Sequence, residues 1–505
     1  MNRAKLIKTD RGYHLMVEDK PFLILGGEIH NSSASDIDYM QEKVWPSVRK
    51  LNLNTLIVPI YWELIEPQEG IYDDTLVKAL IEQATAEKTK LVFLLFGLWK
   101  NAESTYVPDW VKQDTETYFL ARDRFGKPFH SISPLCEKAV EKDAAAFSRL
   151  MASIEKNDTA GTVVMVQVEN EMGIVGDVRD FSAAADAAYA ADIPQAVAQW
   201  AGKQGSWQTC FDTDAPEFFM AYQYACAVQR IAKSGKTQCN LPMYVNCWMD
   251  QFPRIPGNFP SGGPVAYCME IWKQFAPEID MLCPDIYLDY FEEICGQFAK
   301  PNNPLFIPEA RPADDSAANV FSAVGRFHGL GFSPFAIEDL GNQEVKNASD
   351  EVMETLDIAR EAFRPEGAGE VLAASYRVLA NLSDVLLQNY GTANLQGFTQ
   401  YGRPGTMLHF DAFDVIIRYT EQRNAKGGGL VVQLEKDAFL VAGLNFTFSF
   451  VTKADDRRIA QVVTLEEGEY TEDGWKKHRV LNGDERYIPQ LGERAECQYI
   501  RVRAV

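Results

Sequence analysis

The sequence has no hydrophobic run long enough to cross a membrane. A membrane-spanning helix needs about 20 mostly apolar residues, and no stretch of the 505-residue chain meets that requirement. The chain begins Met-Asn-Arg-Ala-Lys-Leu-Ile-Lys-Thr-Asp, which is too polar for the apolar core of a secretion signal. We therefore expect a cytoplasmic protein that does not contact a membrane.

Basic residues are scarce relative to acidic ones. The chain has 49 Lys and Arg against 71 Asp and Glu, a formal net charge of −22 and an isoelectric point near 4.8. This charge repels nucleic acids and anionic membrane surfaces at long range. We expect no nucleic acid partner, and we favour a neutral substrate.

Cysteine and histidine occur but are not clustered. The nine cysteines are scattered without a C-x-x-C pair, and the six histidines are dispersed along the chain. Disulfide frameworks and metal sites show recognisable spacings of their ligands. The pattern therefore favours buried, reduced thiols, with no metal site and no cofactor.

The sequence does contain an alternation of short apolar runs with segments of helical periodicity. Each run ends in polar residues, and most lack polar alternation, which is typical of strands buried on both faces of a parallel sheet. The runs are Phe22–Leu25, Thr55–Ile60, Leu91–Phe96, Val163–Val168, Met243–Asn246, Met281–Cys283, Leu305–Ile307 and Pro334–Ile337. Eight strands with intervening helices predict an α/β fold, a (β/α)8 TIM barrel.

From about Gly391 the hydrophobic period changes to two, and helix-length patterns stop. This change predicts an appended all-β sandwich domain over residues 389–505, following a catalytic barrel domain over residues 1–388. Residues 174–214 are Ala-rich and irregular. We interpret them as an insertion over the strand ends, because loops of that length in compact domains are usually functional.

Two of the predicted strands end in glutamates. The run Val163–Val168 is followed by Glu169-Asn170-Glu171, and the run before Pro308 is followed by Glu309. Glycoside hydrolysis uses two carboxyl groups, about 5–5.5 Å apart when the anomeric configuration is retained. We take Glu171 and Glu309 as the catalytic pair, although a single strand-end Glu is more often a solvated cap or an ion-pair partner.

Other strand ends carry side chains that suit a sugar. Asn170 can hydrogen-bond the hydroxyl beside the reacting carbon, and three tryptophans follow strand ends and offer faces for stacking on a sugar ring. These tryptophans are Trp62, Trp99 and Trp248, for which packing in the core or at the barrel rim is the alternative. Glu28 and Glu63 also end strands, where they either bind the sugar or support the barrel mouth.

Three blocks of the sequence resemble a known family. Gly26–His30, Tyr61–Pro67 with Gly70–Tyr72, and Val166–Gly173 are similar to the corresponding blocks of the glycoside hydrolase family 35 β-galactosidases. The resemblance covers roughly residues 20 to 340, and its V-Q-V-E-N-E-x-G block is specific. The C-terminal region also resembles the sandwich of a bacterial galactosidase-like subset.

The resemblance implies roles for individual residues. It implies that Glu171 is the general acid and base and that Glu309 is the nucleophile. It also implies that Asn170 binds the sugar and that Tyr287 hydrogen-bonds the nucleophile. It does not favour Glu169.

The sequence departs from the family at two places. Leu98-Trp99-Lys100-Asn101 stands where better-known members have a Cys-Ala-Glu-Trp block whose Ala-Glu contacts galactose, so Asn101 is a candidate contact. Arg311 stands near the place of an aromatic residue past the nucleophile. Lys100 and Arg311 either favour a sugar that bears a carboxylate or pair with nearby acids, namely Glu28, Glu63 or Asp339.

Together these features predict a retaining, exo-acting β-galactosidase that releases a terminal β-linked sugar by double displacement. One alternative is a retaining β-glycosidase of the same clan that acts on a β-glucoside, an arabinoside or a uronide. Another is a carbohydrate-binding barrel that has lost catalysis. A homo-oligomer in which the insertion or the sandwich completes a neighbour's pocket also remains open.

Overall fold

Eight parallel strands close into a barrel in the first two thirds of the chain. The computed structural model describes residues 3–250, 253–342, 367–420, 426–453 and 458–505. In chain order the barrel strands are β4 (Ile24–Glu28), β5 (Thr55–Tyr61), β6 (Lys90–Phe96), β9 (Val163–Gln167), β10 (Met243–Cys247), β11 (Met281–Ile286), β12 (Ile307–Ala310) and β13 (Gly331–Pro334). Their residues are almost all buried, as expected for strands covered on both faces. The predicted barrel is confirmed.

The eighth strand lies earlier than its hydrophobic run predicts. β13 ends at Pro334, and Ile337 begins the short helix α14 (Ile337–Gly341). The strand was hidden because it contains Gly331 and Ser333, which carry no hydrophobic signal. Glycine is needed there because a Cβ on Gly331 would lie 2.3 Å from the Cβ of Ile24 in the neighbouring strand.

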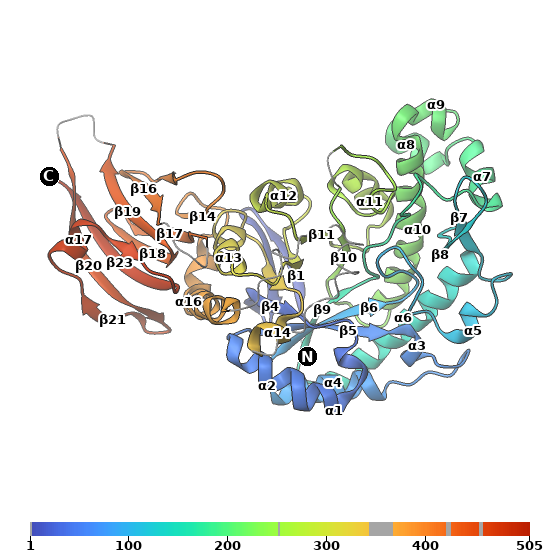
Figure 1. Cartoon of the computed structure of the whole chain (residues 1–505), viewed down its shortest axis with the longest axis horizontal. Coiled ribbons are helices and arrows are strands. Elements are labelled where there is room, and N and C mark those ends of the chain that lie inside the picture. Colours follow the sequence, from blue (N-terminus) through green and yellow to red (C-terminus); the bar gives the residue numbers. More distant parts are fainter. Residues whose placement is uncertain (1–2, 251–252, 343–366, 421–425, 454–457) are drawn as a thin grey trace.

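Helices surround the barrel and connect its strands (Figure 1). After β4 the chain is helical in consecutive short pieces, α1 (Ile37–Tyr39), η2 (Met40–Val44), α2 (Trp45–Val48) and η3 (Arg49–Leu51). The longer helices are α4 (Thr75–Ala86), α6 (Glu137–Asn157), α10 (Ala215–Lys236), α11 (Met269–Phe275), α12 (Phe291–Phe298), α13 (Ser316–Gly325) and α16 (Ala368–Asn389). On α6, Phe147, Leu150 and Ile154 are buried at helical spacing against the core.

The composition of residues 174–214 suggested an irregular segment, but these residues contain helices. It folds into α7 (Ala183–Ala190), α8 (Gln195–Ala201) and α9 (Trp207–Phe211). Serine caps begin two of these helices, since the Ser182 and Ser206 hydroxyls accept hydrogen bonds from Ala185 N and Thr209 N. The alanine runs are therefore helix formers, which the absence of a clear hydrophobic stripe concealed.

Two further sheets follow helix α16 (Figure 1). One sheet has six strands, in spatial order β14 (Leu395–Thr399), β17 (Gly428–Glu435), β18 (Ala438–Leu444), β23 (Glu496–Ala504), β20 (Ala460–Thr471) and β21 (Gly474–Val480). The other has four, in spatial order β15 (Gly405–His409), β16 (Phe413–Tyr419), β19 (Phe446–Thr452) and β22 (Gln490–Leu491). The predicted sandwich is confirmed, but the run Phe439–Phe450 forms two strands, because Asn445 turns the chain with a φ of 59°.

Strands β17 and β18 join the sandwich to the barrel domain. Val431 and Val441 face the core between the two sheets, whereas Leu430 and Leu440 belong to the core shared with the barrel helices. Because both faces of these strands are buried, their sequences are nearly continuous hydrophobic runs rather than alternating ones. The sandwich is therefore packed firmly against the barrel domain.

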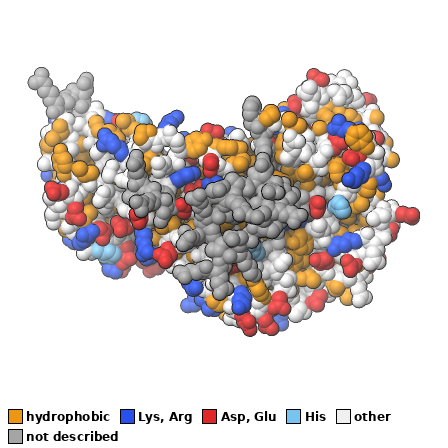
Figure 2. Space-filling view, viewed as in Figure 1, with side chains coloured by type: hydrophobic (Ala, Val, Ile, Leu, Met, Phe, Trp, Pro, Cys, Tyr) orange, Lys and Arg blue, Asp and Glu red, His pale blue; other side chains and the backbone are white. Residues whose placement is uncertain are grey.

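The visible surface carries charges of both signs. Acidic and basic side chains are interspersed over the barrel and over the C-terminal sheets (Figure 2). Among the described helices, none combines the length and the apolar character that a bilayer span requires.

Tyr376 on α16 provides a test of how the helix is joined to the barrel. Its buried hydroxyl donates toward the carbonyl oxygens of Gly26 (2.7 Å) and Phe332 (3.0 Å), which lie in β4 and β13. Losing a buried hydrogen bond costs about 1–3 kcal/mol. We expect Tyr376→Phe to lower the thermal unfolding midpoint by several degrees, and Tyr487→Phe, at a side chain that is 86% exposed, to leave it unchanged. Equal midpoints for the two variants would contradict this role.

Candidate active site

The carboxyl ends of four barrel strands bring four buried carboxyl groups together. They are Glu28 at the end of β4, Glu171 after β9, Asp285 in β11 and Glu309 in β12, and none is more than 8% exposed. Burial raises the pKa values of Glu28 and Asp285, and the charges of Glu171 and Glu309 raise both further, so all four groups lie close enough to interact. This is the face at which TIM-barrel proteins carry their functional residues.

The backbone that presents Glu171 is strained. Glu169 and Glu171 have φ angles of 61° and 45°, a left-handed conformation that costs of order 1–3 kcal/mol for such residues. Hydrogen bonds from neighbouring segments hold it, because Ala102 N donates to Glu171 O at 3.0 Å and Glu171 N donates to Asn246 Oδ1 at 3.0 Å. Such strain is typical of functional sites.

Glu309 is held from one side. The Tyr287 hydroxyl donates to its Oε1, whereas no described residue hydrogen-bonds its Oε2. Burial and the Glu171 charge raise the pKa of Glu309 to about 7, while Lys100 and the Tyr287 hydrogen bond oppose that rise. Asp285 lies beside it in register across β11 and β12.

Glu28 and Asp285 supply further acid groups. Burial raises the pKa of each well above its usual value, and neighbouring carboxylates add to the effect. Neither oxygen of Glu28 has a hydrogen-bond partner among the described residues. Asp285 is tied by Asn246, whose Nδ2 donates to its Oδ2 at 2.7 Å. A neutral Glu28 can donate and accept hydrogen bonds, which suits a ligand rich in hydroxyls.

A lysine lies among these acids. Lys100 is 8% exposed, and its ammonium lies 5.1 Å from the centre of the Phe96 ring and donates to Asn170 Oδ1 at 3.0 Å. Its charge partly offsets the rise in the pKa values of Glu28 and Glu309 that burial causes. The Nδ2 atom of Asn170 is buried and has no partner among the described residues.

The positions of Trp62 and Trp99 do not fit a role in stacking on sugar. Both side chains are fully buried, and their indole nitrogens donate to Glu66 Oε2 and to Ile132 O, each at 2.9 Å. Protein atoms therefore cover their rings, and core packing, the alternative considered above, is what the structure shows. Trp248 lies past the end of β10 and is partly exposed.

Three other residues predicted to contact the sugar, Glu63, Asn101 and Arg311, differ from one another in their surroundings. Glu63 in α3 (Trp62–Ile65) is 37% exposed and pairs with Lys112 at 3.2 Å. Asn101 adjoins the pocket, where its Oδ1 is buried without a partner among the described residues. Arg311 pairs with Asp289 at 3.0 Å and with Asp315, rather than with Glu28, Glu63 or Asp339.

Glu169 belongs to a separate buried pair. It accepts a hydrogen bond from Trp99 N at 2.7 Å, and its carboxyl group lies close to that of Asp143 of helix α6. The two carboxyl groups meet at Gly97, where a Cβ would lie 2.4 Å from Glu169 Oε1 and 2.8 Å from Asp143 Oδ1. Burial raises the pKa of Asp143 to about 6 and that of Glu169 well above its usual value.

Sequence reasoning did not select Asn246 or Asp285 as site residues. They lie at the ends of adjacent barrel strands, β10 and β11, so their position at strand ends was the available signal. Sequence reasoning did consider Lys100, but for a charged sugar or an ion pair, and it missed the contact of Lys100 with Asn170.

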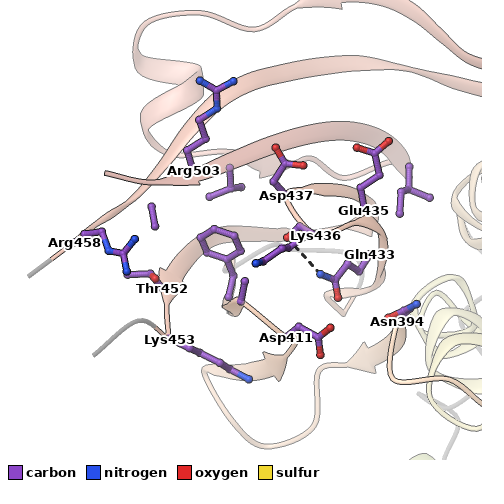
Figure 3. A pocket seen from close by; sticks show the side chains of 15 residues that line it. Asn394, Asp411, Gln433, Glu435, Lys436, Asp437, Thr452, Lys453, Arg458 and Arg503 are labelled. Carbon is purple, nitrogen blue, oxygen red and sulfur yellow. Dashed lines mark hydrogen bonds between the residues drawn. The ribbon is translucent and has the colours of Figure 1, made fainter. Parts of the chain in front are cut away.

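A second cleft, of about 1170 Å³, opens between the two C-terminal sheets (Figure 3). Acidic and basic side chains alternate along it, and within it Gln433 Nε2 donates to Lys436 O at 3.5 Å. Its carboxylates Glu435 and Asp437 pair with Arg501 at 2.9 and 3.1 Å. These are exposed ion-pair partners, so this cleft does not match the desolvated carboxyl groups of the barrel mouth.

The fold and the site define a class: a TIM-barrel protein whose mouth is lined by buried carboxyl groups. Residues 14–261 match the model of the family described as Glycosyl hydrolases family 35. This part of the chain is therefore similar to glycoside hydrolase family 35. Residues 372–491 match a domain of unknown function, DUF5597, so the C-terminal region matches a family of its own.

The chain is similar to curated β-galactosidases over part of its length. It is 27% identical over 189 residues to the "Beta-galactosidase" of Xanthomonas manihotis, covering 36% of this chain and 28% of that protein. It is also 27% identical over 179 residues to "Beta-galactosidase 14" of Arabidopsis thaliana, covering 33% and 18%. The chain spans less than a third of the length of these relatives.

A solved structure shares the fold. The crystal structure of β-galactosidase from Bacillus circulans sp. alkalophilus matches with a TM-score of 0.50 and 14% identity, covering 72% of this chain and 57% of that chain. At this identity the match supports the architecture alone.

The buried pair Glu169 and Asp143 predicts how stability depends on pH. Because both pKa values are raised above those of an unfolded chain, these two groups bind more protons in the native state than in the unfolded state from about pH 4 upward. Stability is therefore lost as pH rises through the native pKa values. We expect Glu169→Gln, which cannot ionise, to weaken this loss. The thermal unfolding midpoint of the variant minus that of wild type should therefore increase as the pH is raised from 5 to 8.

Glu82→Gln is the matched control, because this Glu on α4 is 66% exposed. Its midpoint should follow that of wild type at both pH values. If the Glu169→Gln variant also kept a constant offset from wild type, the pair would not be the source of the pH dependence.

Proposed function

We propose that the protein is a retaining, exo-acting β-galactosidase. The observation that carries the proposal is the pair Glu171 and Glu309, two buried carboxyl groups at the carboxyl end of the barrel that lie close enough for the Glu171 charge to raise the pKa of Glu309. Asn170 Nδ2 and Glu28 offer further polar atoms without protein partners among the described residues. Buried polar groups are normally paired, so this set suits a polyhydroxylated ligand.

In the first step Glu309 acts as the nucleophile. The Tyr287 hydroxyl occupies its Oε1, which leaves Oε2 to attack the anomeric carbon. As the new C–O bond forms, the bond to the leaving group breaks, and Glu171 transfers its proton to the departing oxygen. Lys100 and Tyr287 both stabilise the ionised form of Glu309 that this attack requires.

In the second step Glu171, now ionised, takes a proton from water. The water oxygen bonds to the anomeric carbon, the bond to Glu309 breaks, and the sugar leaves with its configuration retained. The hydrogen bonds to Glu171 N and Glu171 O keep its backbone in place through both steps.

The choice of sugar is supported by the names of the similar proteins, which are β-galactosidases. A β-glucoside or arabinoside would use the same carboxyl pair. A uronide is less well supported, because Lys100 already serves Asn170 and Arg311 is paired with Asp289 and Asp315. The remaining alternative, an inactive binding barrel, is disfavoured by the presence of both glutamates.

We also propose that the enzyme works in a reducing compartment such as the cytoplasm. All nine cysteines lie in the described part of the chain, and all are free thiols, eight of them buried. Free thiols in this number are typical of proteins from such compartments.

A panel of nitrophenyl glycosides tests the reaction. We expect wild type to hydrolyse the β-galactoside, and Glu309→Ala to lose at least about a thousandfold in kcat because the nucleophile is absent. Azide should restore part of the activity of this variant by attacking the anomeric carbon in place of the carboxylate.

Glu82→Gln is the matched control, since Glu82 lies on helix α4, away from the strand ends, and is 66% exposed. It should retain most of the kcat of wild type. Hydrolysis of α-galactosides instead of β-galactosides, or full activity of Glu309→Ala, would contradict the proposal.

The pKa of Glu309 predicts the pH dependence of the reaction. Burial and the Glu171 charge raise this pKa to about 7, so the nucleophile is in the ionised form that the attack requires only above about neutral pH. We therefore expect kcat/KM to fall about tenfold per pH unit below pH 7, measured with a substrate whose leaving group needs no protonation. A kcat/KM that stays constant from pH 7 down to pH 5 with this substrate would contradict the assignment.

A further inference from the structure

Lys100 is fixed to the segment that carries the predicted acid and base. Its backbone forms a parallel bridge with Asn170, and Asn170 N donates to Trp99 O at 3.1 Å. On the other side, Lys100 N donates to Glu103 O at 2.8 Å, and Glu103 N returns a bond to Lys100 O at 3.0 Å. The side chain therefore starts from a rigid turn.

The Lys100 ammonium determines which way the Asn170 amide faces. An ammonium group can only donate hydrogen bonds, so the atom of Asn170 that lies 3.0 Å from it must be the oxygen, Oδ1. The other end of the amide is then Nδ2, a donor. This nitrogen is buried and meets no acceptor among the described residues.

The surroundings of Lys100 leave its ammonium free to hold this contact. It lies against the Phe96 ring, and its charge partly offsets the rise in the pKa of Tyr106 that burial causes. Among the described residues it has no carboxylate within 4.0 Å, although Glu28 and Glu309 feel its charge. Asn170 is thus its hydrogen-bond partner in the described structure, rather than one partner in a larger ion-pair network.

We propose that Lys100 is a positioning residue that locks the Asn170 amide as a hydrogen-bond donor toward the sugar hydroxyl beside the anomeric carbon. The proposal rests on the proposed function of the same site. Without this contact the amide can rotate and present its oxygen or its nitrogen. Lys100 thereby sets how strongly the enzyme depends on that hydroxyl.

The test compares two substrates on each variant. One is the nitrophenyl β-glycoside that wild type hydrolyses, and the other is its 2-deoxy analogue. The measured quantity is the kcat/KM of the glycoside divided by the kcat/KM of its 2-deoxy analogue. This ratio is insensitive to the fraction of folded enzyme, because both substrates report on the same molecules. Loss of a positioned hydrogen bond of about 1.4 kcal/mol corresponds to a factor of about ten.

We expect Lys100→Met to lower this ratio about tenfold, because methionine has similar length but no donor. Lys100→Arg keeps N–H donors and should restore most of the ratio. Lys138→Met is the matched control, since this lysine is 53% exposed on the outside of α6. It should leave the ratio at the wild-type value.

The outcomes separate two failures. An active wild type whose ratio is unchanged by Lys100→Met would overturn the role of Lys100 alone. An equal loss in Lys138→Met, or no recovery in Lys100→Arg, would also overturn it. A wild type that hydrolyses none of the glycosides would overturn the proposed function, and the role of Lys100 with it.

Discussion

The desolvation of several carboxyl groups at the barrel mouth is the constraint on which the site depends. Four acids lie there almost without solvent, and removing a charge from water is costly unless it is neutralised or hydrogen-bonded. Three devices reduce that cost: the Lys100 charge, the Tyr287 hydroxyl on Glu309, and the Asn246 amide on Asp285. The same desolvation, together with the Glu171 charge, raises the pKa of Glu309 to about 7. Desolvation therefore explains both the energetic cost of the site and the raised pKa of the proposed nucleophile.

A rigid backbone carries this group of acids. The left-handed conformation of Glu171 is maintained by a hydrogen bond that Ala102 N donates to Glu171 O and by one that Glu171 N donates to Asn246 Oδ1. Glu169, in the same segment, accepts a hydrogen bond from Trp99 N and lies close to Asp143 of helix α6. Two glutamates of the block Glu169-Asn170-Glu171 thus have different surroundings: Glu171 lies near Glu309, and Glu169 lies near Asp143 of helix α6.

Most of the barrel could be predicted because strands buried on both faces leave a strong hydrophobic signal. The prediction failed at β13, where Gly331 serves a close approach to Ile24, and in the segment 174–214, where alanine helices leave a weak signal. In the site, the ends of the predicted strands identified Glu171 and Glu309 as candidate carboxyl groups. Hydrophobicity could not tell an indole in the core from one that faces a ligand, which is why stacking on a sugar and core packing both stayed open for Trp62 and Trp99.

By itself the sequence determined the fold class and the strand ends at which acids would collect, because periodicity and the block Val166–Gly173 are local properties. Only the tertiary structure decided how those acids are used. Closing the barrel brought Lys100, Glu28 and Glu309 around one pocket, although they are far apart along the chain. Electrostatic interaction and desolvation depend on distance and burial in space, and neither quantity can be obtained from the order of residues.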